Sequence, residues 1–192
     1  MNMKLPKGRG AVSDGQDTNL TVAPTRFITK DAKTLVIYFS HSGNTEYQAR
    51  IAQAVLHADS YELVIKTPYP TDYEATVSRA NQEQAGALPH LRVEDLPDFT
   101  QYDLVLFGSP IWRMTLANPM QAFLKQFGQQ MGGKKVAEFT THAGYGAGTA
   151  QQVLQKLTPV STTILSDYTV KDTEIEKTTT QFKTWLHQTE EK

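Results

Sequence analysis

The segment Ser40-His41-Ser42-Gly43-Asn44-Thr45 places small and hydroxyl-bearing residues between an apolar run and a helical pattern. Small residues let successive backbone N–H groups point at one anion, and the Ser40, Ser42 and Thr45 hydroxyls can donate further hydrogen bonds. A helix that starts here adds roughly half a positive charge. Without a lysine the segment is not a Walker loop, and it also differs from GxGxxG. We interpret it as a cradle for a terminal monophosphate; the alternative is an ordinary helix capped by Asn44 or Ser42.

A second segment, Gly108-Ser109-Pro110-Ile111-Trp112-Arg113-Met114, also follows an apolar run. The Trp112 indole could stack on a flat heteroaromatic ring. Such stacking contributes about 0.5–1.5 kcal/mol beyond the burial of apolar surface area. Alternatively, Trp112 packs into the helix that follows. The segment therefore predicts one wall of a slot for a planar ligand.

A third segment, Thr140-Thr141-His142-Ala143-Gly144-Tyr145-Gly146-Ala147-Gly148, follows a further apolar run. Three glycines at alternate positions permit positive φ and close backbone approach, which suits N–H groups that bind the carbonyl edge of a planar ligand. Tyr145 offers a second aromatic wall, and His142 is either a proton donor near the ring or a structural or solvent-facing residue. GxGxxG belongs after the first strand, so we do not interpret these glycines as a nicotinamide site.

Strands and helices alternate along the chain from residue 33 onward. Short apolar, β-branched and aromatic runs predict strands buried on both faces, and amphipathic periodicity predicts helices between them. The predicted strands span 34–39, 60–65, 103–108, 135–140 and 162–170, and the predicted helices span 45–57, 119–127, 149–157 and 173–187. This alternation indicates a doubly wound α/β fold, in which ligands bind at the carboxyl ends of the strands. The three segments above would all lie there.

Two further regions complete the organisation. Residues 1–32 hold several glycines and prolines without periodicity, and we expect an irregular N-terminal extension before a single domain of residues 33–192. Pro68-Tyr69-Pro70 follows a predicted strand, so Tyr69 and Tyr73 could line a substrate pocket; the alternative is a surface helix capped by Asp72.

Composition narrows the classes of function. The 192 residues carry a formal net charge of −1, which is unlike a basic nucleic-acid-binding protein. The absence of cysteine excludes disulfides, Cys-ligated metal centres and a thiol nucleophile. No apolar run approaches the ~18 residues of a membrane span, and no signal-peptide pattern is present, so we expect a cytoplasmic location. We expect no metal site, and the GxSxG motif of serine hydrolases is absent.

Together, the three segments resemble the flavodoxin-like family. SHSGNT is similar to its phosphate loop, the stretch from Thr67 to Trp112 is similar to a bacterial branch, and THAGYGAG resembles its third loop. The resemblance implies a short-chain flavodoxin fold with a five-stranded parallel sheet of order 2-1-3-4-5, helices on both faces, and non-covalent FMN. It implies that the cofactor contacts Ser40, Ser42, Gly43, Asn44, Thr45, Ser109, Pro110, Ile111, Trp112, Arg113, Thr141, His142, Ala143, Gly144, Tyr145, Gly146 and Gly148.

The resemblance also implies a redox function. FMN would pass electrons to a redox partner protein or to a small acceptor such as a quinone, with no residue acting as a nucleophile. Alternatives are an NAD(P)H-dependent quinone or flavin oxidoreductase, a non-catalytic FMN-binding module, and a phosphate- or nucleotide-binding domain without flavin. Dedicated flavodoxin shuttles are strongly acidic as a family, whereas this chain is nearly neutral. Arg113 stands where relatives commonly have a second Trp.

Overall fold

The first apolar run forms strand β2 (Thr34–Tyr38), and all its residues are buried in the computed structural model, which describes residues 23–191. Leu35 and Ile37 pack into one core cluster, while Val36 and Tyr38 pack into a second cluster on the opposite face. Side chains alternate between the two faces of a strand, so an uninterrupted apolar run marks a strand that is covered on both sides.

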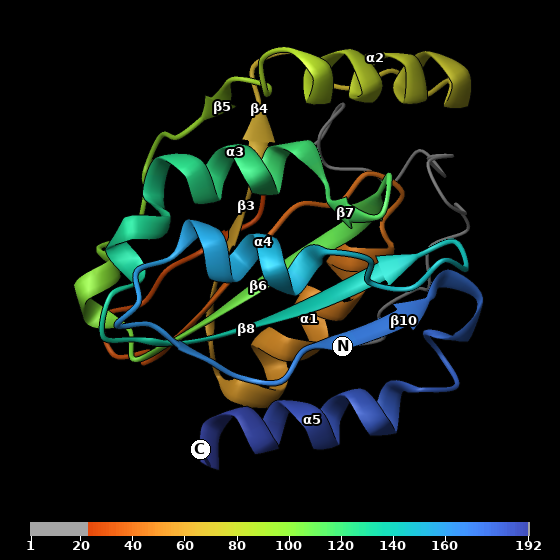
Figure 1. The fold of residues 1–192 in the computed structure, drawn as a ribbon. Helices are drawn as coiled ribbons and strands as arrows, with labels where there is room; N and C mark the ends of the chain where they lie inside the picture. The colour runs from red at the N-terminus through yellow and green to blue at the C-terminus, as the bar shows by residue number, and fades with distance from the viewer. Residues whose placement is uncertain (1–22, 192) are drawn as a thin grey trace.

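The central sheet is mostly parallel (Figure 1). Its main path runs β1-β3-β2-β6-β8-β10, and only the edge strand β1 on this path is antiparallel. Short strands β7 and β9 pair with β6 and β8, and β4 and β5 form a separate two-stranded sheet. The remaining strands are β1 (Arg26–Phe27), β3 (Asp59–Glu62), β4 (Val64–Ile65), β5 (Leu91–Arg92), β6 (Leu104–Trp112), β7 (Thr115–Leu116), β8 (Lys135–His142), β9 (Thr163–Ile164) and β10 (Tyr168–Lys171).

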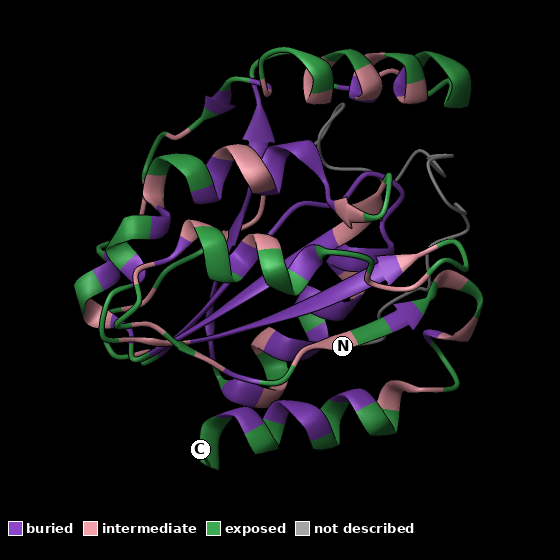
Figure 2. Cartoon of the chain, viewed as in Figure 1, coloured by how far each residue is buried: buried purple, intermediate pink, exposed green. Residues whose placement is uncertain are grey.

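Helices cover both faces of the sheet, which confirms the predicted α/β class. The helices are α1 (Asn44–Leu56), α2 (Tyr73–Ala85), α3 (Asn118–Phe127), α4 (Ala150–Leu157) and α5 (Thr179–Glu191). α1 and α5 pack on one face of the sheet, while α3 and α4 pack on the other (Figures 1 and 2). α2 lies apart from these layers and above α3 in Figure 1, and only Thr76 and Ala80 are buried among its residues.

Part of the expected irregular extension is an edge strand. Arg26 and Phe27 pair with Tyr61 and Ser60 of β3, and the Arg26 guanidinium lies 3.8 Å from the centre of the Tyr61 ring. The Thr29 N–H and hydroxyl both donate to the carboxylate of Asp59. This strand is too short to show any sequence periodicity, which explains why it was not predicted. Residues 1–22 of the extension lie outside the described residues.

The predicted fifth strand, residues 162–170, is divided into β9 and β10. At the break, the Ser166 carbonyl accepts a hydrogen bond of 2.9 Å from the Trp185 indole, and the Leu165 carbonyl accepts one from Gln151. These carbonyls therefore bond to helix side chains and leave the strand ladder. Within residues 23–191, none of the helices has the length and apolar character that a bilayer span requires.

Candidate functional site

Helix α1 begins without a side-chain cap. Its N-cap residue is Gly43, whose φ of 88° is readily adopted by glycine, and no side chain at this position accepts from the first turn. The alternative prediction, a helix capped by Asn44 or Ser42, is therefore wrong. Instead, the Gly43 N–H donates to Ser40 Oγ at 3.1 Å, and Asn44 Nδ2 donates to Ser42 Oγ at 3.2 Å. The loop is folded upon itself, and the N-cap residue of the helix offers no side chain to the first turn.

A hydroxyl–hydroxyl contact joins the first and third predicted segments. Thr45 Oγ1 lies 2.8 Å from Thr141 Oγ1, and both residues are buried. Thr45 is in the first turn of α1, while Thr141 is near the end of β8. The two segments, almost a hundred residues apart in sequence, therefore lie side by side at one edge of the sheet.

The second segment is a strand continued into a hairpin, in place of the loop that the sequence suggested. β6 extends to Trp112 and returns as β7 through the two-residue turn Arg113–Met114, with Trp112 paired to Thr115. Both turn residues have positive φ, 49° and 62°. This is the conformation of tight hairpin turns in which glycine and asparagine are usual. Holding Arg113 and Met114, which are neither glycine nor asparagine, at positive φ costs about 1–2 kcal/mol each.

The strained turn is fixed by the last residue of the third segment, Gly148, and by Thr149, which follows it. The Met114 carbonyl accepts from the Thr149 N–H at 2.8 Å and from its hydroxyl at 3.2 Å. Gly148, with φ of 57°, lies so close that a Cβ there would be 2.0 Å from the Met114 oxygen. A side chain at 148 would therefore push the two loops apart.

Trp112 rests on a cluster of aromatic rings. Its indole meets Phe39, His41 and Tyr69 edge-on, with centroid distances of 5.6, 6.0 and 4.9 Å. It packs on this cluster, which belongs to a core that also contains residues of the following helix α3, and it lines a cavity as well. Tyr69 is buried behind Trp112, whereas Tyr73 borders the cavity, so of the two predicted tyrosines only Tyr73 faces it.

A polar network fixes Tyr69 and α2 behind the indole. The carboxylate of Glu83 accepts hydrogen bonds from the Tyr69 hydroxyl, from Asn118 Nδ2 at 2.9 Å and from Arg79 Nε at 2.9 Å. Arg79 also donates to the carbonyls of residues 67 and 68 and lies over the Tyr69 ring. Burial, together with the Glu83 carboxylate, raises the pKa of the Tyr69 hydroxyl well above its usual value. The network ties α2 to α3 and to the aromatic cluster.

His142 is half-buried at the end of β8. Its Nδ1 accepts the Gly144 N–H at 2.9 Å, so this nitrogen carries no proton and the neutral ring is protonated at Nε2. Burial lowers the His142 pKa, an effect opposed by Asp172 and reinforced by Lys171. His142 is therefore a neutral hydrogen-bond donor through Nε2 near pH 7.

These features meet in one cavity of about 430 Å³ at the carboxyl edge of the sheet. Among the predicted residues, those that line it are Ser42, Asn44, Pro110, Ile111, Trp112, Arg113, Thr141, His142, Ala143 and Tyr145. The other predicted residues are not part of its lining: Ser40, Gly43, Thr45, Ser109, Gly144, Gly146 and Gly148. Ser109 is fully buried, and its hydroxyl accepts the Ala117 N–H at 3.0 Å, which fixes the β6–β7 hairpin.

Helix α2 supplies a wall that sequence reasoning missed. Thr76, Val77, Ala80 and Asn81 line the cavity together with Tyr73. Their spacing of three and four residues puts them on one helical face, and this signal was available in the sequence. Met114 and Asp172 complete the lining.

Comparison with known proteins places this arrangement in a family. A family model described as flavodoxin matches residues 33–189. The chain belongs to the flavodoxin family. A flavoprotein from Lactobacillus acidophilus NCFM, solved in complex with FMN, is 26% identical over 76% of this chain and 97% of its own, with a TM-score of 0.60. A protein of Bacteroides uniformis ATCC 8492, described as an inferred flavoprotein, is 25% identical over 82% and 99% of the two chains, with a TM-score of 0.68.

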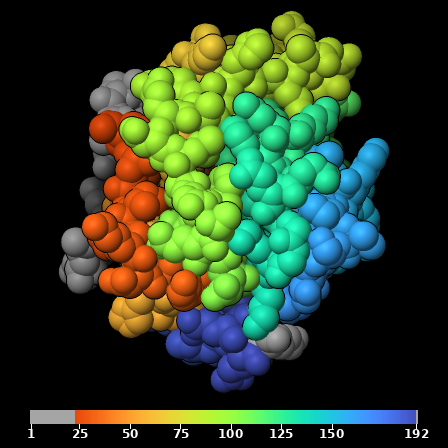
Figure 3. All heavy atoms as spheres, turned by 90° about the vertical axis from the view of Figure 1, so that its left-hand side faces the viewer, coloured from red at the N-terminus to blue at the C-terminus, as the bar shows by residue number. Residues whose placement is uncertain are grey.

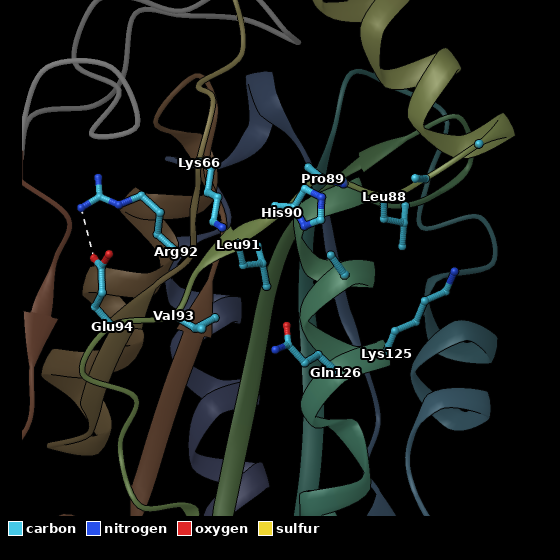
Figure 4. A pocket seen from close by; sticks show the side chains of 13 residues that line it. Lys66, Leu88, Pro89, His90, Leu91, Arg92, Val93, Glu94, Lys125 and Gln126 are labelled. Atoms are coloured by element: carbon cyan, nitrogen blue, oxygen red, sulfur yellow. Dashed lines mark hydrogen bonds and ion pairs between the residues drawn. The ribbon is translucent and has the colours of Figure 1, made fainter.

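A second, larger hollow of about 800 Å³ lies away from the site of this flavodoxin-family protein. It is formed where β5 and the segment before it meet α3, on the face shown in Figure 3. Lys66, Arg92 and Lys125 border it, and Arg92 is paired with Glu94 at 3.1 Å (Figure 4). None of the predicted site residues lines this hollow, so the smaller cavity is the candidate functional site.

Proposed function

We propose that this protein binds FMN non-covalently and uses it to transfer electrons. The observation that carries the proposal is one cavity that combines the start of α1, where the N-cap is a glycine, with an apolar slot at the carboxyl ends of β6 and β8. FMN has the same two parts, one phosphate and one flat ring. The FMN complex of the Lactobacillus relative supports this assignment.

The phosphate end of the cavity suits a monophosphate. Ser42 and Asn44 line it, and the N-cap residue Gly43 has no side chain that accepts a hydrogen bond from the first-turn N–H groups of α1. Neutral donors at a helix N-terminus bind an anion without a lysine. We infer that Ser42, Asn44 and the first turn of α1 hold the phosphate, while Ser40 and Gly43 shape the loop.

The ring end of the cavity suits a planar heteroaromatic group. Ile111, Trp112 and Val77 provide apolar contact, while Thr141 and His142 provide polar atoms at the end of β8. His142 is a neutral donor through Nε2, so it can bond a ring carbonyl without carrying charge. FMN, when bound, supplies the exchange of electrons. The protein's residues bind and orient it, and none of them has to act as a nucleophile.

FMN titration tests the binding step. Purified chain freed of any cofactor should bind FMN and show flavin absorbance. Trp112→Ala should weaken binding by ~1–3 kcal/mol, the range for stacking on a base, or roughly 5–150-fold in Kd. Trp112→Phe is the matched control because it keeps an aromatic ring, and it should lose much less. An unchanged Kd in Trp112→Ala would place the ring elsewhere, and no FMN binding by the unaltered chain would overturn the proposal.

Redox turnover tests the second step. The FMN-loaded protein should be reduced by dithionite under nitrogen and reoxidised by a quinone or by an electron-accepting protein. Rapid reduction by NADPH would identify an NAD(P)H-dependent oxidoreductase, which the near-neutral charge of the chain favours over a dedicated shuttle. Failure to cycle with any donor would leave a non-catalytic FMN-binding module. We retain a cytoplasmic location as part of the proposal.

A further inference from the structure

The larger hollow between β5 and α3 differs in chemical character from the candidate site. Its volume is about 800 Å³, and the two cavities share no lining residue. Lys66, Arg92 and Lys125 bring three positive charges to its lining, and Glu94 is the one acidic residue among the described residues that line it. The whole chain carries a formal charge of −1, so these positive charges are a local concentration. We refer to this cavity as the basic hollow.

The positive charges stand on both sides of the basic hollow. Lys66 directly follows β4 and Arg92 lies in β5, whereas Lys125 lies in the last turn of α3 on the other side (Figure 4). Within residues 23–191, neither lysine has an ion-pair partner. Arg92 is paired with Glu94, but the two side chains are 48% and 68% exposed, and such a pair contributes little stability. The basic hollow therefore suits a ligand with several carboxylates.

β5 presents one strand edge that has no strand partner. It pairs only with β4, so its second edge is unpaired within the part of the chain that the structure describes. The Lys66 N–H donates to the His90 carbonyl at 2.8 Å, and residues that bond to one neighbour alternate along a strand with residues that face the other way. The backbone groups of Leu91 therefore point away from β4, and Leu91 lines the basic hollow. An edge of this kind can pair with an extended chain.

Side chains around β5 alternate between an apolar and a polar face. Leu91 is buried and Val93 is partly buried, and both pack into the core. His90, Arg92 and Glu94 are exposed. A strand that pairs with β5 must alternate in the same way, because successive side chains point to opposite faces and contact those of the neighbouring strand. One set of its side chains would meet apolar groups and the other set would meet the cations.

Other ligands fit the basic hollow less well. No Phe, Tyr or Trp lines it among the described residues, so it lacks the rings on which single-stranded bases stack. Residues 1–22 of the chain carry three basic residues, Lys4, Lys7 and Arg9, against Asp14 and Asp17, so their charge has the same sign as that of the basic hollow. A small anion would leave the strand edge and the apolar residues unused.

We propose that the basic hollow binds an extended segment of a partner protein in which acidic and apolar residues alternate, and that this segment adds a strand to β5. Its carboxylates lie near Lys66, Arg92 and Lys125, and its apolar side chains contact Leu91 and Val93. The partner leaves the candidate site open, because the two cavities share no lining residue. This inference does not rest on the proposed function.

Calorimetry of the full chain, with and without FMN, tests the proposal. The probe is an eight-residue peptide, blocked at both ends, that alternates glutamate and valine. A single short strand buries less surface than a stable protein interface, so we expect a micromolar Kd at low salt and weaker binding at high salt. The double variant Lys66→Glu, Lys125→Glu should weaken binding at least tenfold.

The matched control is the double variant Lys156→Glu, Lys183→Glu. It changes the net charge by the same amount at exposed positions of α4 and α5 that lie outside the lining. Lys156, like Lys125, stands in the last turn of its helix, so both double variants perturb one helix end in the same way. Binding to this control should stay within twofold of the unaltered protein. Equal losses in the two double variants would overturn the proposal.

Two peptide comparisons on the unaltered protein test the added strand. A peptide of four glutamates followed by four valines should bind at least tenfold more weakly, because it lacks the alternation. A strand bonds its neighbour through every second residue, so N-methylation of either all glutamates or all valines should abolish binding in one of the two peptides. Undiminished binding of the block peptide, or of both methylated peptides, would show a contact of charges alone and overturn the proposal.

The remaining outcomes are also decisive. Absence of binding by the alternating peptide would overturn the proposal. A dimeric chain that the variant Lys66→Glu, Lys125→Glu dissociates in sedimentation would mean that a second copy fills the basic hollow, which would also overturn it. Should that variant not fold, the peptide comparisons on the unaltered protein still decide. If the chain does not bind FMN, the proposed function fails, whereas the peptide measurements keep their meaning.

Discussion

Glu138 is a buried acid whose environment links stability to pH. It lies on β8, is 1% exposed, and neither carboxylate oxygen has a hydrogen-bond partner among the described residues. Burial, and next the nearby Asp167, raise its pKa from the ordinary value of 4.5 to about 8. A buried carboxylate without a partner is costly, so the folded protein keeps this side chain protonated at neutral pH.

The size and sign of the effect follow from linkage. Below pH 4.5 the group is protonated in both the folded and the unfolded chain. As the pH rises from 4.5 to about 8, the unfolded chain releases this proton while the folded chain retains it, so the free energy of unfolding falls. Above pH 8 both states are ionised and the loss is complete. Between pH 5 and pH 8 the loss is about 3.5 kcal/mol, at about 1.4 kcal/mol per pK unit of difference.

Urea unfolding of Glu138→Gln against the unaltered protein measures this loss. The amide is close in size and cannot ionise. The variant should therefore gain about 3.5 kcal/mol relative to the unaltered protein when the pH is raised from 5 to 8. Glu176→Gln, at an exposed position, is the matched control and should show no such gain. A constant difference between Glu138→Gln and the unaltered protein at all pH values would refute the reasoning.

Three further predictions concern the loops and the network around the cavity. Arg113→Gly should be more stable than Arg113→Ala by about 1 kcal/mol, because glycine tolerates φ of 49°; equal melting temperatures would contradict the assigned strain. Gly148→Ala should lose at least ~2 kcal/mol in urea unfolding, because its Cβ would overlap the Met114 oxygen; a neutral substitution would mean that the loops separate easily. Glu83→Gln should cost ~3 kcal/mol by the same assay, because it leaves the Arg79 guanidinium without its anion; a loss below 0.5 kcal/mol would show that water replaces the contact.

The sequence predicted those parts of the fold that depend on periodicity. Runs rich in apolar residues located β2, β6 and β8, because strands buried on both faces carry mostly apolar side chains. The chemical types in the three loops located the cavity, because carboxyl ends of parallel strands meet at one edge. Local composition could not show that β6 continues to Trp112, since that extension depends on pairing with β7 and on Ser109 holding the hairpin.

Tertiary contacts decided the remaining features. Ser42 and Asn44 are good capping residues in isolation, yet the helix starts one residue after a left-handed glycine and uses neither as its cap. The pair Arg113–Met114 carries no turn signal, and its conformation is fixed by Thr149, which lies more than thirty residues away. Long-range contacts of this kind override local preference, and a single sequence does not reveal them.

The network around Glu83 explains how α2, which lies apart from the two helix layers of the fold, can serve as a wall of the cavity. α2 buries little of its own surface, so packing alone gives it little stability. The carboxylate of Glu83 joins Tyr69 and Arg79 from the same stretch of chain to Asn118 of α3, and a nearly buried anion is stable only while such donors remain together. Tyr69 in turn supports the edge of Trp112. The Glu83 carboxylate therefore sets the position of α2 and of the Trp112 indole, which stand on neighbouring walls of the cavity. The width of the cavity depends on these polar contacts behind its walls as well as on the residues that line it.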